Sequence, residues 1–525
     1  MSRTDPQSGY HGNEEERSEV EGNGDSSPMS EYFREGSGSE KEVEGRTSTQ
    51  SKDEYHNGSE IGRHISRSEH GPSGLYPSPR DPTCPSEPAL SRRGSTSTHG
   101  TEVGGIAQLP TASRVSTDPH GNTYPEGGLE AYLVVLGCFL ALFGTLGMLN
   151  SVGTFQAYLI NNQLKGYSDG SIGWIFSVYV FLTFFGGIQF GPITDAKGPR
   201  FLVLAGSTIA VVDHILVGFC TKYWHFMIVL GLLNGIATSL IFTPAISSVG
   251  HFFLRLRGHA TGLATTGGSL GGVVIPLMLQ ALFPKIGFAW ATRALALVCF
   301  CSLAVACLLV RNRLPPKPAT RENMLPDFRM FLDPVFTLAT IGIFFCDLGI
   351  FLPITYISSY GIDNGVSHAF SYQLLALLNV GSIFGRWLPG IAADYIGRFN
   401  TMIITVFLCV ASTAALWLPA GGTVAMLVVY VLLFGFASGS NIGLAPVCIG
   451  QLCATENYGR YYASAYTFVS FGTLIGIPIA GQIKTASGGD YWGLITFTAL
   501  LYVAALFSFI AAKILKLGWK PFAVF

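Results

Sequence analysis

The fold is decided by a short stretch, Gly191-Pro-Ile-Thr-Asp195-Ala-Lys-Gly198-Pro-Arg200, whose pattern recurs as Gly390-Ile-Ala-Ala-Asp394-Tyr-Ile-Gly397-Arg398. The shared pattern is Gly-x3-Asp-x2-Gly, and its three matched positions are each 199 residues apart (390−191, 394−195 and 397−198). Each copy lies between two long apolar segments, which predicts a short charged turn between two membrane-spanning helices. A repeat of about 200 residues in so apolar a chain predicts two homologous halves that face each other.

The composition is that of a membrane protein with a separate polar segment. Of 525 residues, 49% are hydrophobic and 12% are charged, whereas about 25% are charged in an ordinary soluble domain. Residues 1–129 hold 33 of the 65 charges, 21 acidic and 12 basic, so this segment carries −9. The other 396 residues hold 12 acidic and 20 basic groups, a balance of +8. The basic groups lie in separate loops rather than along one face, which predicts no nucleic-acid partner.

Motifs for other kinds of chemistry do not emerge from the sequence. Nine of the ten Cys lie in apolar runs without ligand spacing, so we expect buried thiols rather than disulfides or a metal site. We find no phosphate-binding loop and no His-Glu-x-x-His. The sequence therefore predicts no cofactor, and neither an ATP-driven pump nor an enzyme.

The chain divides into a polar tail and twelve apolar segments. Residues 1–129 are rich in Ser, Gly, Glu and Pro and lack apolar periodicity, so we expect a disordered cytosolic tail. A span needs about 20 apolar residues. The predicted spans are 131–156, 171–192, 201–221, 225–248, 259–283, 290–311, 334–358, 368–392, 400–419, 423–447, 460–482 and 491–513.

These spans predict an all-α polytopic membrane protein built from two pseudo-symmetric six-helix halves. The first half is expected at 130–311 and the second at 334–515. A cytosolic linker, 312–333, joins the halves, and a short cytosolic C-terminus, 516–525, follows the second.

Orientation follows from Lys and Arg in the short loops, which favour the cytosolic side of a membrane. Because twelve is even, both termini lie on one side, which we call the tail side. The tail side holds eleven such residues in its loops and three in the C-terminal segment, namely Lys197, Arg200, Arg255, Arg257, Arg311, Arg313, Lys317, Arg321, Arg329, Arg398, Arg460, Lys513, Lys516 and Lys520. The opposite side holds five, namely Lys165, Lys222, Lys285, Arg293 and Lys484. We expect both termini in the cytosol and the protein in the plasma membrane, with the vacuolar membrane as the alternative.

The repeated turn also predicts how the halves meet. Asp195 and Asp394 are carboxylates that can hold a helix N-terminus, where the positive dipole end favours an anion by about 0.3–1 kcal/mol. We expect their partners near Gly459 and Gly258, at the starts of helices eleven and five, when the cytosolic side is closed. The predicted gating residues are Gly191, Asp195, Gly198, Arg200, Gly390, Asp394, Gly397 and Arg398.

Small-residue seams predict close packing that lets one half rock against the other. The seams are Gly258-x3-Gly262, Gly267-x3-Gly271, Gly268-x3-Gly272, Gly381-x3-Gly385, Gly435-x3-Gly439-x3-Gly443 and Gly472-x3-Gly476.

Several stretches together resemble a known family. They are the two Gly-x3-Asp-x2-Gly turns, Pro125-Glu-Gly-Gly128, Asn150-Ser-Val-Gly-Thr-Phe-Gln156, Gly267-Gly-Ser-Leu-Gly-Gly272 and Gly385-Arg386. On these stretches the chain resembles the major facilitator superfamily and, within it, the monocarboxylate-transporter-like branch of fungi, over residues 124–515. The resemblance implies that an Arg in helix eight, here Arg386, binds substrate. Animal members of the branch also carry an Asp four residues earlier and a Lys in helix one, whereas Ser382 and Asn150 stand here.

Charged residues inside the membrane are few, and each costs about 2.5–3.5 kcal/mol by insertion scales, so each needs a reason. Arg386 has a planar fork that suits a substrate carboxylate, and Asp347 would balance it or accept a proton. The alternative is a permanent ion pair that holds helices seven and eight in register. Asp213 and His214 lie in a helix that usually packs outside the cavity, so we expect a structural role for them.

Uncharged polar residues on the expected cavity helices complete the predicted binding site. The substrate-binding candidates in that site are Arg386, Asp347, Asn150, Gln156, Asn379 and Asn441, with Tyr158, Thr243, Tyr356, Ser440 and Ser470 as further polar positions. Each could equally make an interhelical hydrogen bond worth about 0.6 kcal/mol.

The function that these features predict is secondary active transport of a small, monocarboxylate-like organic anion by alternating access. The driving force would be a proton or the substrate gradient. One alternative is an efflux transporter for an acidic or aromatic metabolite, and another is a non-transporting membrane sensor that signals through its tail. We expect a monomer whose partners are the organic anion, a proton and the lipid bilayer.

Overall fold

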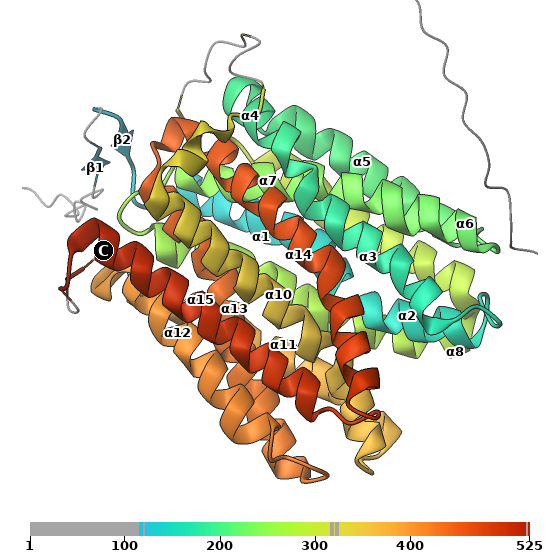
Figure 1. Ribbon diagram of the computed structural model, residues 1–525. Coiled ribbons are helices and arrows are strands. Elements are labelled where there is room, and N and C mark those ends of the chain that lie inside the picture. Colours follow the sequence, from blue (N-terminus) through green and yellow to red (C-terminus); the bar gives the residue numbers. More distant parts are fainter. Residues whose placement is uncertain (1–114, 119–120, 315–319, 321–324, 521–522, 525) are drawn as a thin grey trace, which may run out of the picture. The chain divides into compact units, whose positions relative to one another are not determined.

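The computed structural model describes residues 115–118, 121–314, 320, 325–520 and 523–524, all within one compact unit, Gly104–Phe525. Most of the predicted tail, residues 1–114, lies outside the described residues. The described part of the chain is a bundle of long helices, with the helices of the first half in blue to green and those of the second in yellow to red (Figure 1).

The first half begins with a two-stranded hairpin in which β1 (Ser116–Thr117) pairs antiparallel with β2 (Thr123–Tyr124). Its helices are α1 (Leu129–Asn150), α2 (Val152–Asn161), α3 (Asp169–Phe185), α4 (Gly187–Lys197), α5 (Arg200–Val217), α6 (Tyr223–Phe226), the π-helical η1 (Met227–Leu233), α7 (Asn234–Gly250) and α8 (Arg257–Leu309). Two spans of this half combine helices that follow one another directly: α3 with α4 in Gly170–Lys197, and α6 with η1 and α7 in Tyr223–Gly250.

The second half follows a short 3-10 turn, η2 (Phe328–Leu332), in the predicted linker. Its helices are α10 (Pro334–Asp363), α11 (His368–Ile396), α12 (Arg398–Ser412), the π-helical η3 (Thr413–Trp417), α13 (Val424–Leu452), the 3-10 turn η4 (Thr455–Asn457), α14 (Tyr458–Ala486) and α15 (Trp492–Leu517).

The number of spans agrees with the sequence prediction. Eleven helical stretches of the described chain are long and apolar enough to cross a membrane. One of them, α8, has 53 residues and leaves the helical region at Gly287 (φ 76°, ψ 168°). Because a span needs only about 20 residues, α8 contains two spans. The predicted fold class, an all-α polytopic protein with twelve spans in two halves, is thus confirmed.

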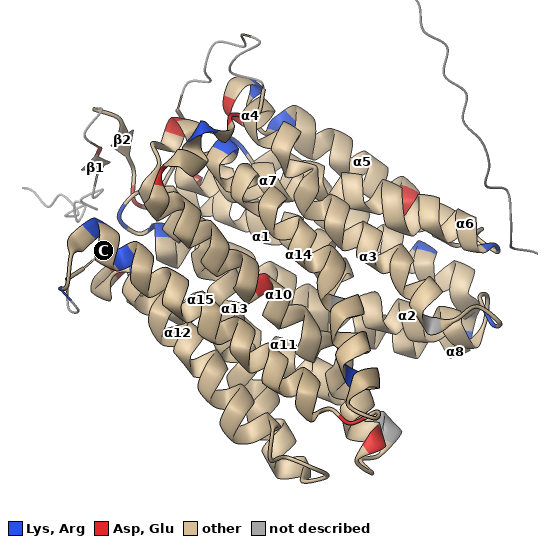
Figure 2. Cartoon of the chain, in the orientation of Figure 1, with Lys and Arg blue, Asp and Glu red and all other residues tan. Residues whose placement is uncertain are grey.

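Charges follow the same architecture. Figure 2 shows Lys, Arg, Asp and Glu concentrated near the two ends of the helices, with few along their lengths. This distribution fits a bundle whose middle lies in lipid, where a charge is expensive.

Residues that pack against the helix bundle begin earlier than the boundary expected at residue 130. Tyr124 of β2 has 0% of its surface exposed and Glu126 only 8%. Their partners lie far along the chain, which is why composition alone assigned these residues to the tail.

The glycine seams serve a different purpose from the one expected of most of them. Gly267 lies against the Phe139 carbonyl of α1, and Gly385 lies against the Phe436 carbonyl of α13, so both pack helices within one half. Gly258 and Gly262, by contrast, lie against α11 of the other half. Most seam glycines therefore hold each half together as a body, and few lie on the surface between the halves.

Gly385→Ala should lower the melting temperature of the purified protein. The added methyl group would overlap the backbone carbonyl of Phe436, and backbone atoms cannot move aside. Such overpacking costs about 1–3 kcal/mol. Gly170→Ala is the matched control, because nothing lies within 4 Å of the position of its added carbon. Equal melting temperatures for the two variants in a thermal-unfolding assay would contradict the packing described here.

Candidate functional site: a gate and an interhelical cavity

The two repeated turns make equivalent contacts across the halves. The Asp195 carboxylate at the end of α4 accepts hydrogen bonds from the backbone N–H groups of Gly459 (3.0 Å) and Arg460 (2.8 Å). Asp394 at the end of α11 accepts from Gly258 (2.8 Å) and His259 (2.7 Å). Each carboxylate thus caps the first turn of a helix in the opposite half, α14 or α8. These are the helix starts named from the sequence as partners.

The glycines of the motif explain its spacing. A methyl group on Gly191 would overlap the Gly459 carbonyl, and one on Gly390 would overlap the Gly258 carbonyl, so only glycine allows the helices to approach this closely. Three residues past each Asp the chain takes a positive φ, 81° at Gly198 and 103° at Gly397. This conformation ends one helix and starts the next within a few residues.

The arginines of the two motif copies differ in their surroundings. Arg200 is exposed at the start of α5. Arg398 is partly buried, and its Nη2 donates to the Leu254 carbonyl of the first half at 2.5 Å. Only the second copy therefore adds a cation to the contact between the halves.

A further arginine lies at the same surface, and sequence reasoning counted it only as a loop charge. Arg257 has 0% of its side chain exposed. Its Nη1 donates to the Gly450 carbonyl (2.8 Å) near the end of α13, and its Nη2 to the Gly250 carbonyl (3.0 Å) at the end of α7. The two carbonyls belong to different halves and to helix C-terminal turns, where the dipole favours a cation. Arg257 thereby joins the ends of α7 and α13.

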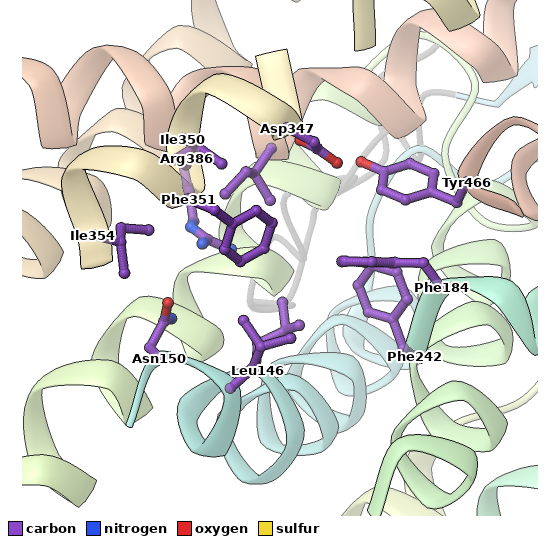
Figure 3. A pocket seen from close by; sticks show the side chains of 12 residues that line it. Leu146, Asn150, Phe184, Phe242, Asp347, Ile350, Phe351, Ile354, Arg386 and Tyr466 are labelled. Carbon is purple, nitrogen blue, oxygen red and sulfur yellow. The ribbon is translucent and has the colours of Figure 1, made fainter. Parts of the chain in front are cut away.

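A cavity lies between the halves, deeper than these contacts. The volume inside it that the centre of a water molecule can occupy is about 40 Å³. Its walls are Leu146, Leu149, Asn150, Phe184, Phe242, Asp347, Ile350, Phe351, Ile354, Arg386, Ile442 and Tyr466. Figure 3 shows these side chains converging from several helices. Eight of the twelve residues are apolar, and three of these eight are Phe, so the cavity is a mostly apolar chamber with four polar groups.

The two charged residues predicted for the site both line this cavity, but they do not contact each other directly. No ion pair joins Arg386 to Asp347 among the described residues. Arg386 is turned toward the first half, where its Nη1 donates to the Thr265 carbonyl (3.1 Å), while its Nε donates to Ser382 (3.3 Å). Asp347 points instead toward the hydroxyl of Tyr466 (Figure 3). The direct couple expected from the sequence is therefore absent in this state, in which two of the guanidinium donors bond to the oxygens of Thr265 and Ser382.

The uncharged candidates divide into two groups. Asn150 lines the cavity and donates from Nδ2 to the Gly268 carbonyl (3.2 Å). Asn379 is buried close to it, next to Gly272, and donates to the Leu375 carbonyl of its own helix (3.1 Å). The structure thus brings Asn150, Asn379 and Arg386 to the same region where α1, α8 and α11 meet.

The other two candidates lie elsewhere. Asn441 accepts from the Thr405 hydroxyl (2.9 Å) and donates to Cys409 (3.5 Å), so it faces α12 within the second half. Gln156 lies on α2 beside Gly173 of α3 and is not among the cavity-lining residues. The sequence could not distinguish a helix face that meets the cavity from one that meets a neighbouring helix.

Asp213 and His214 form a buried pair in α5, with Nδ1 of His214 3.3 Å from Oδ2 of Asp213. Both side chains are at most 3% exposed, and neither lines the cavity. The structural role expected from the sequence stays a prediction.

The aromatic walls of the cavity were missed by sequence reasoning. Phe184, Phe242 and Phe351 resemble every other apolar residue of a membrane helix. Tyr466 did have a signal, because Tyr458, Tyr462 and Tyr466 recur every four residues, and they lie in a row with ring centroids 6.0 and 4.7 Å apart. A row of tyrosines on one helical face indicates a surface that meets something other than lipid.

The geometry describes a chamber closed on the tail side. The capping contacts and the hydrogen bonds of Arg257 and Arg398 lie at the tail-side ends of α4, α7, α11 and α13, or next to them. The space open to water centres, about 40 Å³, holds only a few water molecules. In the described state the contacts between the halves thus close the cavity on the tail side.

Two six-helix halves, reciprocal helix caps and a cavity between the halves define a polytopic membrane transporter. A family model for the Major Facilitator Superfamily matches residues 135–477. The chain belongs to this superfamily, as its sequence motifs predicted.

Relatives and solved structures agree with this assignment. The "Riboflavin transporter MCH5" of Saccharomyces cerevisiae is 35% identical over 422 residues, covering 76% of this chain and 81% of the relative. The "Aspyridones efflux protein apdF" of Emericella nidulans is 35% identical over 399 residues, covering 75% and 80%. The human organic anion transporter MFSD10 shares the fold, with a TM-score of 0.58 at 16% identity, over 73% of this chain and 100% of that one.

Replacing both Asp195 and Asp394 by Asn should weaken the tail-side closure. Each charge at a helix N-terminus contributes about 0.3–1 kcal/mol, so losing both should raise the ratio of open to closed molecules roughly threefold to thirtyfold. We expect slower turnover in liposomes with nearly unchanged substrate binding. Asp490→Asn, at an exposed position on the opposite side, is the control. A double variant that transports at the wild-type rate would show that the caps do not gate.

Proposed function

We propose that the protein is a secondary active transporter that carries an organic anion with an apolar or aromatic body by alternating access. The observation that carries this proposal is the single cation, Arg386, in a cavity walled by Phe184, Phe242 and Phe351. A guanidinium offers two parallel donors to a carboxylate. The surrounding rings offer apolar area but little hydrogen bonding, so they favour a substrate whose acidic group is attached to an apolar body.

The state of Arg386 supports a binding role. It is 3% exposed, and it donates hydrogen bonds to neutral oxygens, those of Thr265 and Ser382, rather than to a carboxylate. A buried cation held only by neutral acceptors is stabilised further when an anion arrives. If Arg386 were permanently paired with Asp347, a bound substrate anion would stabilise it less. The described residues form no such pair.

Asp347 is the candidate for coupling to protons. Its carboxylate faces the cavity from α10, is 6% exposed and lies in the apolar surroundings of the membrane. A carboxylate in such a place is neutralised either by a nearby cation or by a proton. When a substrate anion occupies Arg386, we expect Asp347 to take up a proton, which would link anion movement to proton movement.

The relatives favour transport but not one cargo. Their names give riboflavin for one and efflux of aspyridones for another, so neither substrate nor direction is transferred from them. Between the alternatives left open by the sequence, the aromatic walls favour an acidic metabolite with an apolar body over a lactate-sized anion. The sensor alternative depended on the tail, most of which lies outside the described residues.

The cationic loops support cytosolic termini, and the plasma membrane is the proposed location. The cavity is enclosed by the two halves of one chain, so a monomer suffices for transport.

Arg386→Lys tests the substrate anchor. The variant keeps a positive charge but loses the bidentate fork, and a hydrogen bond to a charged group contributes about 1.5–3 kcal/mol. We expect kcat/KM to fall roughly tenfold to hundredfold while the protein stays folded. Arg329→Lys, at an exposed position in the linker, should leave it unchanged.

The paired change Arg386→Leu with Asp347→Leu separates substrate binding from helix pairing. If Arg386 only balances Asp347, removing both charges restores the transport lost in Arg386→Leu. If Arg386 holds the substrate, the double variant stays inactive although it is folded. Recovered transport in liposomes would therefore contradict the anchor role.

A substrate panel tests the proposed class directly. We expect aryl and alkyl carboxylates to be transported into liposomes, with affinity rising with apolar size, and the matching amides to be rejected. An inward proton gradient should accelerate uptake by the wild type, and Asp347→Asn should remove that acceleration. Equal transport of a carboxylate and its amide would exclude an anion site at Arg386.

A further inference from the structure

The chain segment just before the first span crosses the tail side of both halves. We call residues 121–126 the strap. It contains β2 and ends three residues before α1 begins at Leu129. Tyr124 in the strap is fully buried, although the segment has the polar composition of the tail.

The strap is fixed to the first half by a carboxylate. Glu126 accepts three backbone hydrogen bonds, from Leu254 (2.9 Å), Arg255 (2.6 Å) and Leu256 (2.9 Å), in the turn that leads into α8. A carboxylate that receives three N–H groups ahead of a helix is a strong anchor. Arg313 of the linker also donates to the Thr123 carbonyl and to its hydroxyl.

The strap is fixed to the second half by hydroxyl and amide groups. The Tyr124 hydroxyl lies 2.9 Å from Oγ1 of Thr455, in the turn between α13 and α14. Nδ2 of Asn122 donates to Glu456 in the same turn at 3.4 Å. The segment therefore bridges two turns that belong to different halves.

Hydrogen-bond polarity links these contacts to Arg257. Tyr124 has one hydroxyl hydrogen and two partners, Thr455 at 2.9 Å and the Asp118 carboxylate at 3.0 Å. A carboxylate only accepts, so Tyr124 donates to Asp118 and accepts from the Thr455 hydroxyl. The Thr455 oxygen in turn accepts from Nη2 of Arg257 at 3.0 Å. An ordered relay thus runs from a buried cation of the first half, through the second half, to the strap.

We propose that the strap is a third closing element of the tail-side gate, in which Tyr124 is a positioning residue that holds the Thr455 turn against Arg257. The inference rests on the alternating-access function proposed above. When the halves separate on the tail side, Thr455 moves away from the strap while Glu126 stays with the first half. Opening therefore requires the Tyr124–Thr455 contact to break.

Cys453 is a native reporter of that opening. It lies two residues before Thr455, outside the spans; its side chain is partly exposed, and desolvation by its surroundings raises the pKa of its thiol to about 12. Because the thiolate is the species that reacts, Cys453 should react slowly with a water-soluble maleimide while the gate is closed. Separation of the halves would expose the Cys453 side chain further and lower the pKa of its thiol, so its labelling rate should rise with the open population. Mass spectrometry of the modified peptide distinguishes it from the other cysteines.

The test compares Cys453 labelling in full-length variants of the purified transporter. Tyr124→Phe removes the hydroxyl and keeps the buried ring, and one lost hydrogen bond should raise the labelling rate about fivefold. Tyr167→Phe, at an exposed tyrosine on the opposite side, should label at the wild-type rate. Thr455→Val should raise the rate, whereas Thr455→Ser, which keeps the hydroxyl, should not.

A double-mutant cycle tests whether the two residues act together. If Tyr124 acts through Thr455, the labelling rate of the combined Tyr124→Phe and Thr455→Val variant should rise by a smaller factor than the product of the two single-variant factors. Independent, multiplicative effects would show that the relay is not a unit and would overturn the positioning role.

The paired Asp195→Asn and Asp394→Asn variant separates the failure of this inference from the failure of the proposed function. Faster labelling in that variant with wild-type labelling in Tyr124→Phe would overturn the strap and leave the gate intact. Wild-type labelling in both would overturn the gating account as a whole. Melting temperatures measured alongside identify any variant whose labelling reflects unfolding.

Discussion

Two carboxylates, each placed on the first turn of a helix in the opposite half, are the interaction on which the rest of the structure depends. Asp195 meets α14 and Asp394 meets α8, each through two backbone N–H groups. Partner and position follow from the pseudo-symmetry, because the end of one repeat unit meets the start of a helix in the other. The close glycines and the positive-φ turns place each carboxylate within reach of those groups.

Such contacts suit a transporter whose two halves must also separate on the tail side. A dipole contribution of about 0.3–1 kcal/mol for each charge is small enough for substrate binding energy to overcome. Among the described residues no disulfide joins the halves. The buried Arg257, joined to helix ends of both halves, adds a contact of the same reversible kind. The cavity lies deeper in the membrane than these tail-side contacts. Its small volume follows from the closure of the tail side.

The sequence revealed what depends on local chemistry and hydropathy. Span number follows from apolar length, the caps follow from an Asp set between glycines, and Arg386 was found because charges inside a membrane helix are rare. The direction in which a side chain faces around its helix axis was harder to predict from the sequence. Asn441 was expected in the cavity but faces α12, and the couple between Arg386 and Asp347 does not form, because helix rotation and competing oxygens decide such contacts.

Contacts between distant segments were not accessible at all. Glu126 and Tyr124 have partners 130 and 331 residues away, so their polar surroundings in sequence indicated a tail. Arg257 lies at a turn, and nothing in the local pattern signals that the second half buries it. The aromatic cavity walls had no distinguishing signal, apart from the tyrosine spacing on α14, because apolar residues fill every membrane helix.

The central claim is that the reciprocal caps set the balance between closed and open states on the tail side. The most direct measurement is the distance distribution between spin labels at Arg200, exposed on α5, and Leu515, exposed on α15, by pulsed electron paramagnetic resonance in lipid nanodiscs. The account predicts one short distance in the otherwise wild-type protein and a second, longer population when Asp195 and Asp394 are both replaced by Asn. An unchanged distribution in that variant would contradict it.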